Sequence, residues 1–187
     1  MSDGAVLEID DALATLGSPA HAAAGGSGSA LAGAIAAAVL AKAARVSGRA
    51  GTAAQAVALE DRLLRFADRD AAVLGEARAA LAQRDLDGGP RRDFELGTVL
   101  RRSLLVPCSI GEACADVAEL AAEERDAVVA DFRPDLAAAA AIAAGAAYAA
   151  AHLVLVNLLA LPEDDEVVAA RRSADRAVRV ARLFDEL

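Results

Sequence analysis

The feature that most limits the possible folds is a long stretch without a charged side chain, residues 136–161. The stretch is long enough to span a lipid bilayer, so a membrane helix has to be weighed against a buried helix of a soluble protein. Half of its residues are alanine, which contributes little to membrane insertion, and it also contains His152 and Asn157. A helix that is apolar all round is equally typical of the centre of a soluble bundle. We expect a buried central helix and no association with a membrane.

The rest of the composition indicates an all-α fold. Aromatic residues make up only 3% of the chain and tryptophan is absent, so the core must consist mainly of alanine, leucine and valine. Alanine has the highest helix propensity, and small side chains let helices approach one another closely. A chain of 187 residues fits one domain with its own core. We therefore predict a single-domain bundle that covers residues 1–187 and contains about six helices.

Clusters of glycine, proline and serine divide the chain into its helices. The sequence predicts helices over about residues 5–16, 30–46, 52–84, 91–124, 134–161 and 163–187. Pro107 lies inside the fourth helix, which should bend or split there, because proline has no N–H group to bond the preceding turn. Pro134 opens the fifth helix at a favoured first-turn position, and Pro162 closes it.

Residues 25–29, with the sequence GGSGS, are predicted to form a loop before the second helix. Glycine favours turns, and serine competes for backbone hydrogen bonds. Such a loop exposes free N–H groups and the positive end of the helix dipole, which suits an anion or a polarised carbonyl. Two known anion motifs do not fit. The dinucleotide fingerprint needs a preceding strand, and the phosphate loop needs Gly-Lys-Ser/Thr at its end.

Charge and cysteine content exclude several classes of function. The formal net charge of −9 and the pI near 4.7 argue against a nucleic-acid partner, since phosphate binding depends on clustered lysine and arginine. Cys108 and Cys114 point to different faces of one predicted helix, so we expect neither a disulfide between them nor a metal site. The first residues are acidic and lack the regions of a signal peptide, so a cytoplasmic location is expected.

Asp70 falls on the apolar face of the helix predicted over residues 52–84. It is in register with a stripe of apolar residues, Leu59, Leu63, Phe66, Leu74 and Leu81. Asp68 lies about 200° away around the helix and should face outward. An unpaired carboxylate in a core is costly. Asp70 therefore either pairs with an arginine or caps a neighbouring helix, or it is a general base of raised pKa in a cleft.

Two further polar residues fall at predicted core positions. Lys42 shares a stripe with Leu31, Ile35, Val39 and Val46. Such a lysine either extends to the surface, or stays buried as a catalytic candidate that pairs with Asp70 or contacts a substrate. Asn157 either bridges helices by hydrogen bonds or orients a polar heterocycle.

Four segments occur in the order and spacing of a known family: AAGGSGSALAGAIAAAV, RFADRDAAVL, LRRSLLVPCSIGEACADVAEL and RPDLAAAAAIAAGAAYAAAHLVLVNL. The chain resembles the cyclodeaminase/cyclohydrolase family. This family includes the cyclodeaminase half of formiminotransferase-cyclodeaminase and bacterial methenyltetrahydrofolate cyclohydrolase. The similarity begins in the first predicted helix and extends beyond Asn157 into the last one.

The resemblance implies an all-helical subunit that forms a homodimer, with a folate site near the subunit interface and the glycine loop. The family's site motifs fall on Gly25, Gly26, Ser27, Asp68, Asp70, Asp135 and Asn157. We expect these residues to bind a folate-like substrate, with Asp70 as the catalytic base and no tightly bound cofactor. Asp135 would hydrogen-bond the pterin ring; without the resemblance, it is a helix-terminal acid favoured by the dipole.

The chain departs from the family pattern at several positions. Ala24, Pro134 and Leu153 replace a glycine, a serine and an asparagine of that pattern, and Lys42 stands where the family is usually apolar. Three functions therefore remain open. The chain hydrolyses 5,10-methenyltetrahydrofolate or cyclises 5-formiminotetrahydrofolate with release of ammonia. Alternatively, it acts on another cyclic amidine, imine or small heterocycle in specialised metabolism, or it is a dimer that binds a ligand without turnover.

Overall fold

The computed structural model describes residues 3–19, 25–82, 90–156 and 163–185, and within these ranges it contains six α-helices and no strand. The all-α prediction is confirmed. The helices are α1 (Asp3–Gly17), α2 (Gly25–Val46), α3 (Ala50–Ala82), α4 (Pro90–Glu123), α5 (Arg133–Val156) and α6 (Asp165–Ala181). Two short 3-10 helices, η1 (Ala130–Phe132) and η2 (Arg182–Phe184), precede α5 and follow α6.

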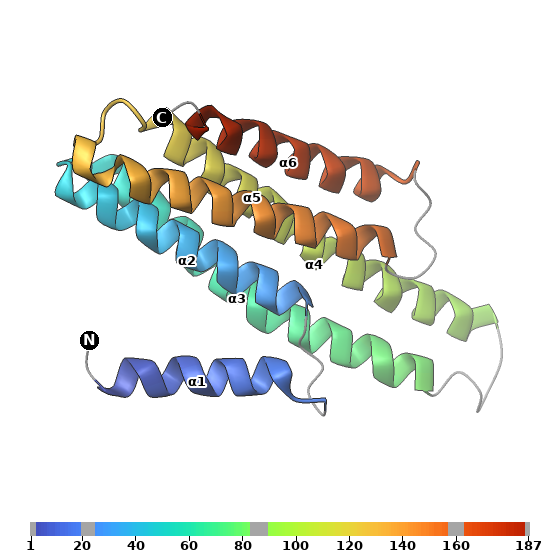
Figure 1. Cartoon of the computed structure of the whole chain (residues 1–187). Coiled ribbons are helices and arrows are strands. Elements are labelled where there is room, and N and C mark those ends of the chain that lie inside the picture. The colour runs from blue at the N-terminus through green and yellow to red at the C-terminus, as the bar shows by residue number, and fades with distance from the viewer. Residues whose placement is uncertain (1–2, 20–24, 83–89, 157–162, 186–187) are drawn as a thin grey trace.

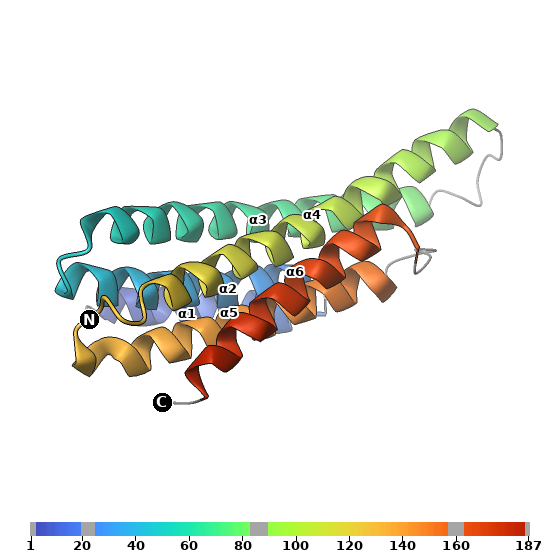
Figure 2. The same cartoon turned by 90° about the horizontal axis from the view of Figure 1, so that it is seen from above.

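Helices α2 to α6 lie side by side in an elongated bundle, with α1 along its outer side (Figures 1 and 2). Sequential helices from α2 to α6 run antiparallel, so α6 is parallel to α4 and joins it through the ion pairs Arg101–Glu166 and Arg176–Asp116. Helix α1 adds its apolar residues to a cavity of about 390 Å³ that α2 and α3 also line. The bundle thus consists of α2 to α6, and α1 covers one of its edges.

Helix α5 is the central element of the bundle. It packs against α2, α4 and α6, and its buried residues are mainly alanine. Two segments, Gly25–Val46 and Ala130–Val156, have the length and hydropathy of a membrane span. A core helix of a soluble bundle has the same features. Because both segments pack against several neighbouring helices, their apolar character supports the predicted buried helix and is only weak evidence for a membrane.

The glycine-rich start of α2 is helical, and the loop predicted over residues 25–29 is wrong. Helix α2 begins at Gly25, where the Ser29 hydroxyl donates to the Gly25 carbonyl at 2.8 Å. Gly26 and Ser27 are buried against α3. A Cβ atom at Gly26 would overlap the Asp70 carboxylate, so glycine allows the two helices to meet here. Tertiary packing therefore outweighs the low helix propensity of this segment.

The structure tests the predictions made for two of the prolines. Pro107 is fully buried within α4, which continues through it as a single helix, so a split at Pro107 is wrong and a bend there stays a prediction. Pro134 lies in the first turn of α5, as expected from its fixed φ angle. Pro162 lies outside the described residues.

An ion pair between the exposed Arg49 and the buried Glu124 holds together the end of the bundle opposite the start of α2. The Glu124 carboxylate accepts hydrogen bonds from Arg49 Nε at 2.8 Å, Arg49 Nη2 at 3.0 Å and Thr52 Oγ1 at 2.7 Å. The hydrogen bond from Arg49, together with the one from Thr52, lowers the pKa of Glu124 despite its burial. This cluster connects the turn between α2 and α3 to the end of α4.

Replacing Glu124 with glutamine should destabilise the fold by about 1–3 kcal/mol, since the hydrogen bonds from Arg49 and Thr52 lose their charged acceptor. The native contribution is full above the unfolded-state pKa of glutamate and is lost as the pH falls through the lower folded-state pKa. The stability difference between wild type and Glu124→Gln, measured by urea unfolding, should therefore shrink in acid. Glu123→Gln, at an exposed neighbour, should unfold as the wild type does.

Two glycines of α2 should respond oppositely to alanine. Gly26→Ala should cost about 1–3 kcal/mol through overpacking against Asp70. Gly28 has open space at its Cβ position, so Gly28→Ala should stabilise the helix by about 0.5–1 kcal/mol. Urea unfolding midpoints of the two variants check this contrast. Equal midpoints would mean that the α2–α3 contact is looser than described.

Candidate functional site

Asp70 is a buried acid in the middle of the bundle. It lies on α3 with 7% of its surface exposed, whereas Asp68, on the same helix, is exposed. The orientations predicted from helical spacing for the two residues are therefore confirmed. Asp68 faces away from Asp70 and does not share its surroundings.

The start of α2 provides the hydrogen-bond partners of Asp70. Ser27 N–H donates to Asp70 Oδ2 at 2.9 Å, and Ser27 Oγ lies 3.2 Å from the same oxygen. The Ser27 hydroxyl is also 2.8 Å from the Ala67 carbonyl oxygen on α3. Since Ser27 belongs to the first turn of α2, Asp70 accepts an N–H group that has no partner within that helix. Asp70 thus caps a neighbouring helix, one of the roles predicted for it, and its role as a base stays a prediction.

The electrostatic state of Asp70 is set mainly by burial. Burial raises the pKa of Asp70 above its usual value, and the hydrogen bonds from Ser27 offset only part of this increase. Within the described ranges, no arginine or lysine forms an ion pair with Asp70. The predicted alternative in which an arginine neutralises Asp70 is therefore absent from this part of the chain. The site contains a carboxyl group that binds a proton more readily than an exposed aspartate does.

Helix α5 reaches the same end of α2. A Cβ atom at Gly25 would lie 3.0 Å from Leu153 Cδ2, so the leucine side chain packs directly beside the first residue of α2. Gly25 itself is exposed. Asn157, expected to bind substrate, lies outside the described residues. Spacing along the sequence did not indicate the contact between Leu153 and Gly25, because it depends on how α5 packs against α2.

Two predicted site residues lie near the other end of the bundle. Lys42 is exposed, with Nζ 5.7 Å from the centre of the Phe132 ring. It is about 24 Å along α2 from Gly26, so the predicted pairing of Lys42 with Asp70 is wrong. The surface position fits the alternative in which the lysine extends to solvent. Asp135 is half-exposed in the first turn of α5, about 27 Å along that helix from Leu153.

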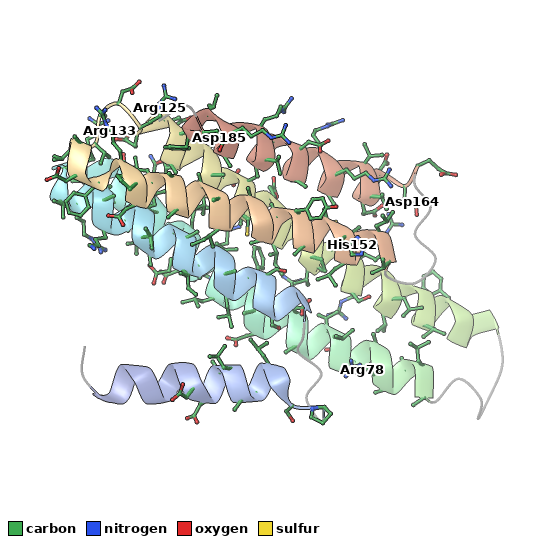
Figure 3. All side chains as sticks on the ribbon, viewed as in Figure 1. Arg78, Arg125, Arg133, His152, Asp164 and Asp185 are labelled. Atoms are coloured by element: carbon green, nitrogen blue, oxygen red, sulfur yellow. The ribbon has the colours of Figure 1, made fainter. Side chains whose placement is uncertain are left out.

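Other polar side chains line separate cavities. A cavity of about 420 Å³ between α3, α4 and α6 includes Arg69 and Glu112 in its lining but not Asp70. A smaller cavity of about 190 Å³ between α5 and α6 includes Tyr148 and His152. Figure 3 shows His152 near the C-terminal end of α5. Among the residues that the structure describes, no cluster of three or more histidine, cysteine or acidic side chains could hold a metal ion.

A solved structure and a family model match this chain. No curated protein matches the chain by sequence. The crystal structure of formiminotetrahydrofolate cyclodeaminase from Thermotoga maritima superposes with a TM-score of 0.78. The match covers 93% of each chain at 14% sequence identity, so it shows a shared fold. A family model described as formiminotransferase-cyclodeaminase matches residues 8–176. Because this match spans nearly the whole sequence, the chain belongs to the formiminotransferase-cyclodeaminase family.

Proposed function

We propose that this chain is a folate one-carbon enzyme. It hydrolyses 5,10-methenyltetrahydrofolate or cyclises 5-formiminotetrahydrofolate with release of ammonia. Family membership supports the substrate class, and the Thermotoga maritima protein with the same fold is a formiminotetrahydrofolate cyclodeaminase. The observation that carries the proposal is the buried carboxyl group of Asp70, held at the start of α2 without an ion-pair partner among the described residues.

Both reactions need a base next to a cationic carbon. In the hydrolysis, water attacks the amidinium carbon and Asp70 accepts a proton from the water. The bond from this carbon to one ring nitrogen then breaks, Asp70 returns the proton to that nitrogen, and the hydroxyl group loses its own proton to solvent as the formyl group forms. In the cyclisation, N10 attacks the carbon of the protonated formimino group, and Asp70 accepts the N10 proton. The bond to the terminal nitrogen then breaks, and Asp70 returns the proton to the ammonia that leaves. The carboxylate also stabilises the positive charge of the reacting carbon.

The backbone at the start of α2 would bind the pterin part of the substrate. Ser27 N–H already donates to Asp70, so the donors left for a ligand in this turn are those of Gly25 and Gly26. Lys42 and Asp135 lie too far along their helices to reach this position in the same chain. They would contribute only from a second copy, so our proposal includes a homodimer that binds a tetrahydrofolate derivative as substrate.

A second candidate function follows from Leu153. This residue packs against Gly25, at a position where the resemblance led us to expect an asparagine. A leucine offers no hydrogen bond to a pterin ring, so the site is less polar than the family pattern implies. This difference favours a substrate that is a smaller or less polar cyclic amidine or imine.

Asp70→Asn should lower the rate of folate turnover by about 100-fold or more, because the amide cannot accept the proton. Loss of methenyltetrahydrofolate absorbance measures the hydrolysis, and formation of the same absorbance from 5-formiminotetrahydrofolate measures the cyclisation. Asp61→Asn is the matched control, since it removes an exposed carboxylate of the same helix that belongs to no predicted site and should retain wild-type rates. If wild type, both variants and buffer give equal rates in both assays, the chain is not a folate enzyme.

The same Asp70→Asn variant should be more stable than the wild type at neutral pH. A raised pKa means that the folded state disfavours ionised Asp70, so the wild type loses stability as the pH rises from the usual aspartate pKa through the higher folded-state pKa. Asparagine is neutral at every pH and retains an oxygen for Ser27 N–H. Thermal unfolding should therefore show a higher midpoint for the variant at neutral pH and no difference in acid. A lower midpoint at neutral pH would mean that Asp70 serves the fold alone.

A further inference from the structure

The Ser27 hydroxyl lies between two acceptors. Its oxygen is 2.8 Å from the Ala67 carbonyl oxygen and 3.2 Å from Asp70 Oδ2. A serine hydroxyl has one hydrogen, so it can form a full hydrogen bond with only one of them at a time. Ser27 is itself 3% exposed, which leaves little room for water to take part. The Ser27 hydroxyl can therefore donate to either of two protein acceptors.

The charge of Asp70 determines which of the two acceptors the Ser27 hydroxyl bonds. A hydrogen bond to an ionised carboxylate is shorter and about twice as strong as one to a neutral acceptor. Ionised Asp70 would therefore attract the hydroxyl away from the Ala67 carbonyl, and neutral Asp70 would let it return. In the structure the Ala67 carbonyl is the nearer of the two acceptors.

The two oxygens of Asp70 have different surroundings. Oδ2 accepts the Ser27 N–H at 2.9 Å, and this backbone bond is available in both charge states. No side chain or backbone group of the described residues donates a hydrogen bond to Oδ1. Among the described residues the donors engage Oδ2 and hold it to α2, which leaves Oδ1 available to the proton.

Charged groups on the neighbouring elements face elsewhere. On α3, Asp68 is exposed and Arg69 lines the cavity shared with α4 and α6, as does Glu112 of α4. On α5, His152 lines the cavity against α6. The described basic residues of α2, Lys42 and Arg45, belong to its far end. Among these residues, Ser27 is the group whose hydrogen bonds respond to the charge of Asp70.

We propose that Ser27 is a positioning residue for Asp70, whose hydroxyl turns from the Ala67 carbonyl to Asp70 Oδ2 when Oδ1 loses its proton. The exchange stabilises the carboxylate when it forms and fixes Oδ2, so that proton transfer takes place at Oδ1. Its effect on turnover rests on the proposed function. The exchange of hydrogen bonds itself does not, and it can be measured without any substrate.

The experiment is a carboxyl-carbon NMR titration of protein labelled with ¹³C-aspartate. The signal that disappears in Asp70→Asn identifies Asp70. Ser27→Ala removes a donor to the ionised form, so the Asp70 midpoint should move to higher pH by about one unit, a tenfold change in proton affinity. Ser27→Thr retains a hydroxyl and should keep a midpoint close to that of the wild type. Circular dichroism of each variant verifies the helical fold.

An unchanged midpoint in folded Ser27→Ala would overturn the inference, as would equal shifts in the alanine and threonine variants. If Ser27→Ala does not fold, Ser27→Cys replaces the hydroxyl with a weak donor and should move the midpoint in the same direction. The acid limb of kcat/KM should follow the NMR midpoint in each variant. A limb that stays fixed while the midpoint moves would remove Asp70 as the base, and with it the proposed mechanism, but not the hydrogen-bond exchange.

Discussion

Close packing of small side chains is the constraint on which this structure depends. Helices α2 and α5 bury mainly alanine, and the few glycines that are buried in α2 lie where another helix comes nearest. A Cβ atom at Gly33 would be 2.5 Å from Cys114 Sγ, and one at Gly26 would overlap the Asp70 carboxylate. A chain with almost no aromatic residues obtains its dispersion energy from this proximity. The same proximity brings a backbone N–H group within hydrogen-bond distance of a buried acid.

Asp70 combines a structural and a chemical property. It accepts an N–H group at the start of α2 that would otherwise have no partner, and this contact joins α2 to α3. Its burial also raises its pKa, so the group that completes the helix end is the one whose ionised form the fold disfavours. Active sites often contain a reactive group whose charged form reduces the stability of the fold.

Sequence reasoning predicted the properties that depend on one helix and missed those that depend on two. Helical spacing placed Asp70 inward and Asp68 outward, because the exposure of a face follows from residues a few positions apart. The partner of Asp70 is 43 residues away in sequence, and no local pattern identifies it. For the same reason the sequence wrongly predicts a loop over residues 25–29 and wrongly offers Lys42 as a partner of Asp70. Neither prediction could take account of how α2 packs against its neighbours.

The cluster of Arg49, Thr52 and Glu124 affects the position of Ser27 at the other end of α2. It fixes the turn between α2 and α3 to the end of α4, and α2 extends from there to Ser27 as an uninterrupted helix. A helix is stiff along its axis, so anchoring one end sets the axial position of the other, more than about 25 Å away. A slip of a single residue would move Ser27 by about 1.5 Å, enough to lengthen its bonds to Asp70 beyond a useful hydrogen-bond distance. The alignment of the carboxyl group is therefore controlled partly from the far end of α2.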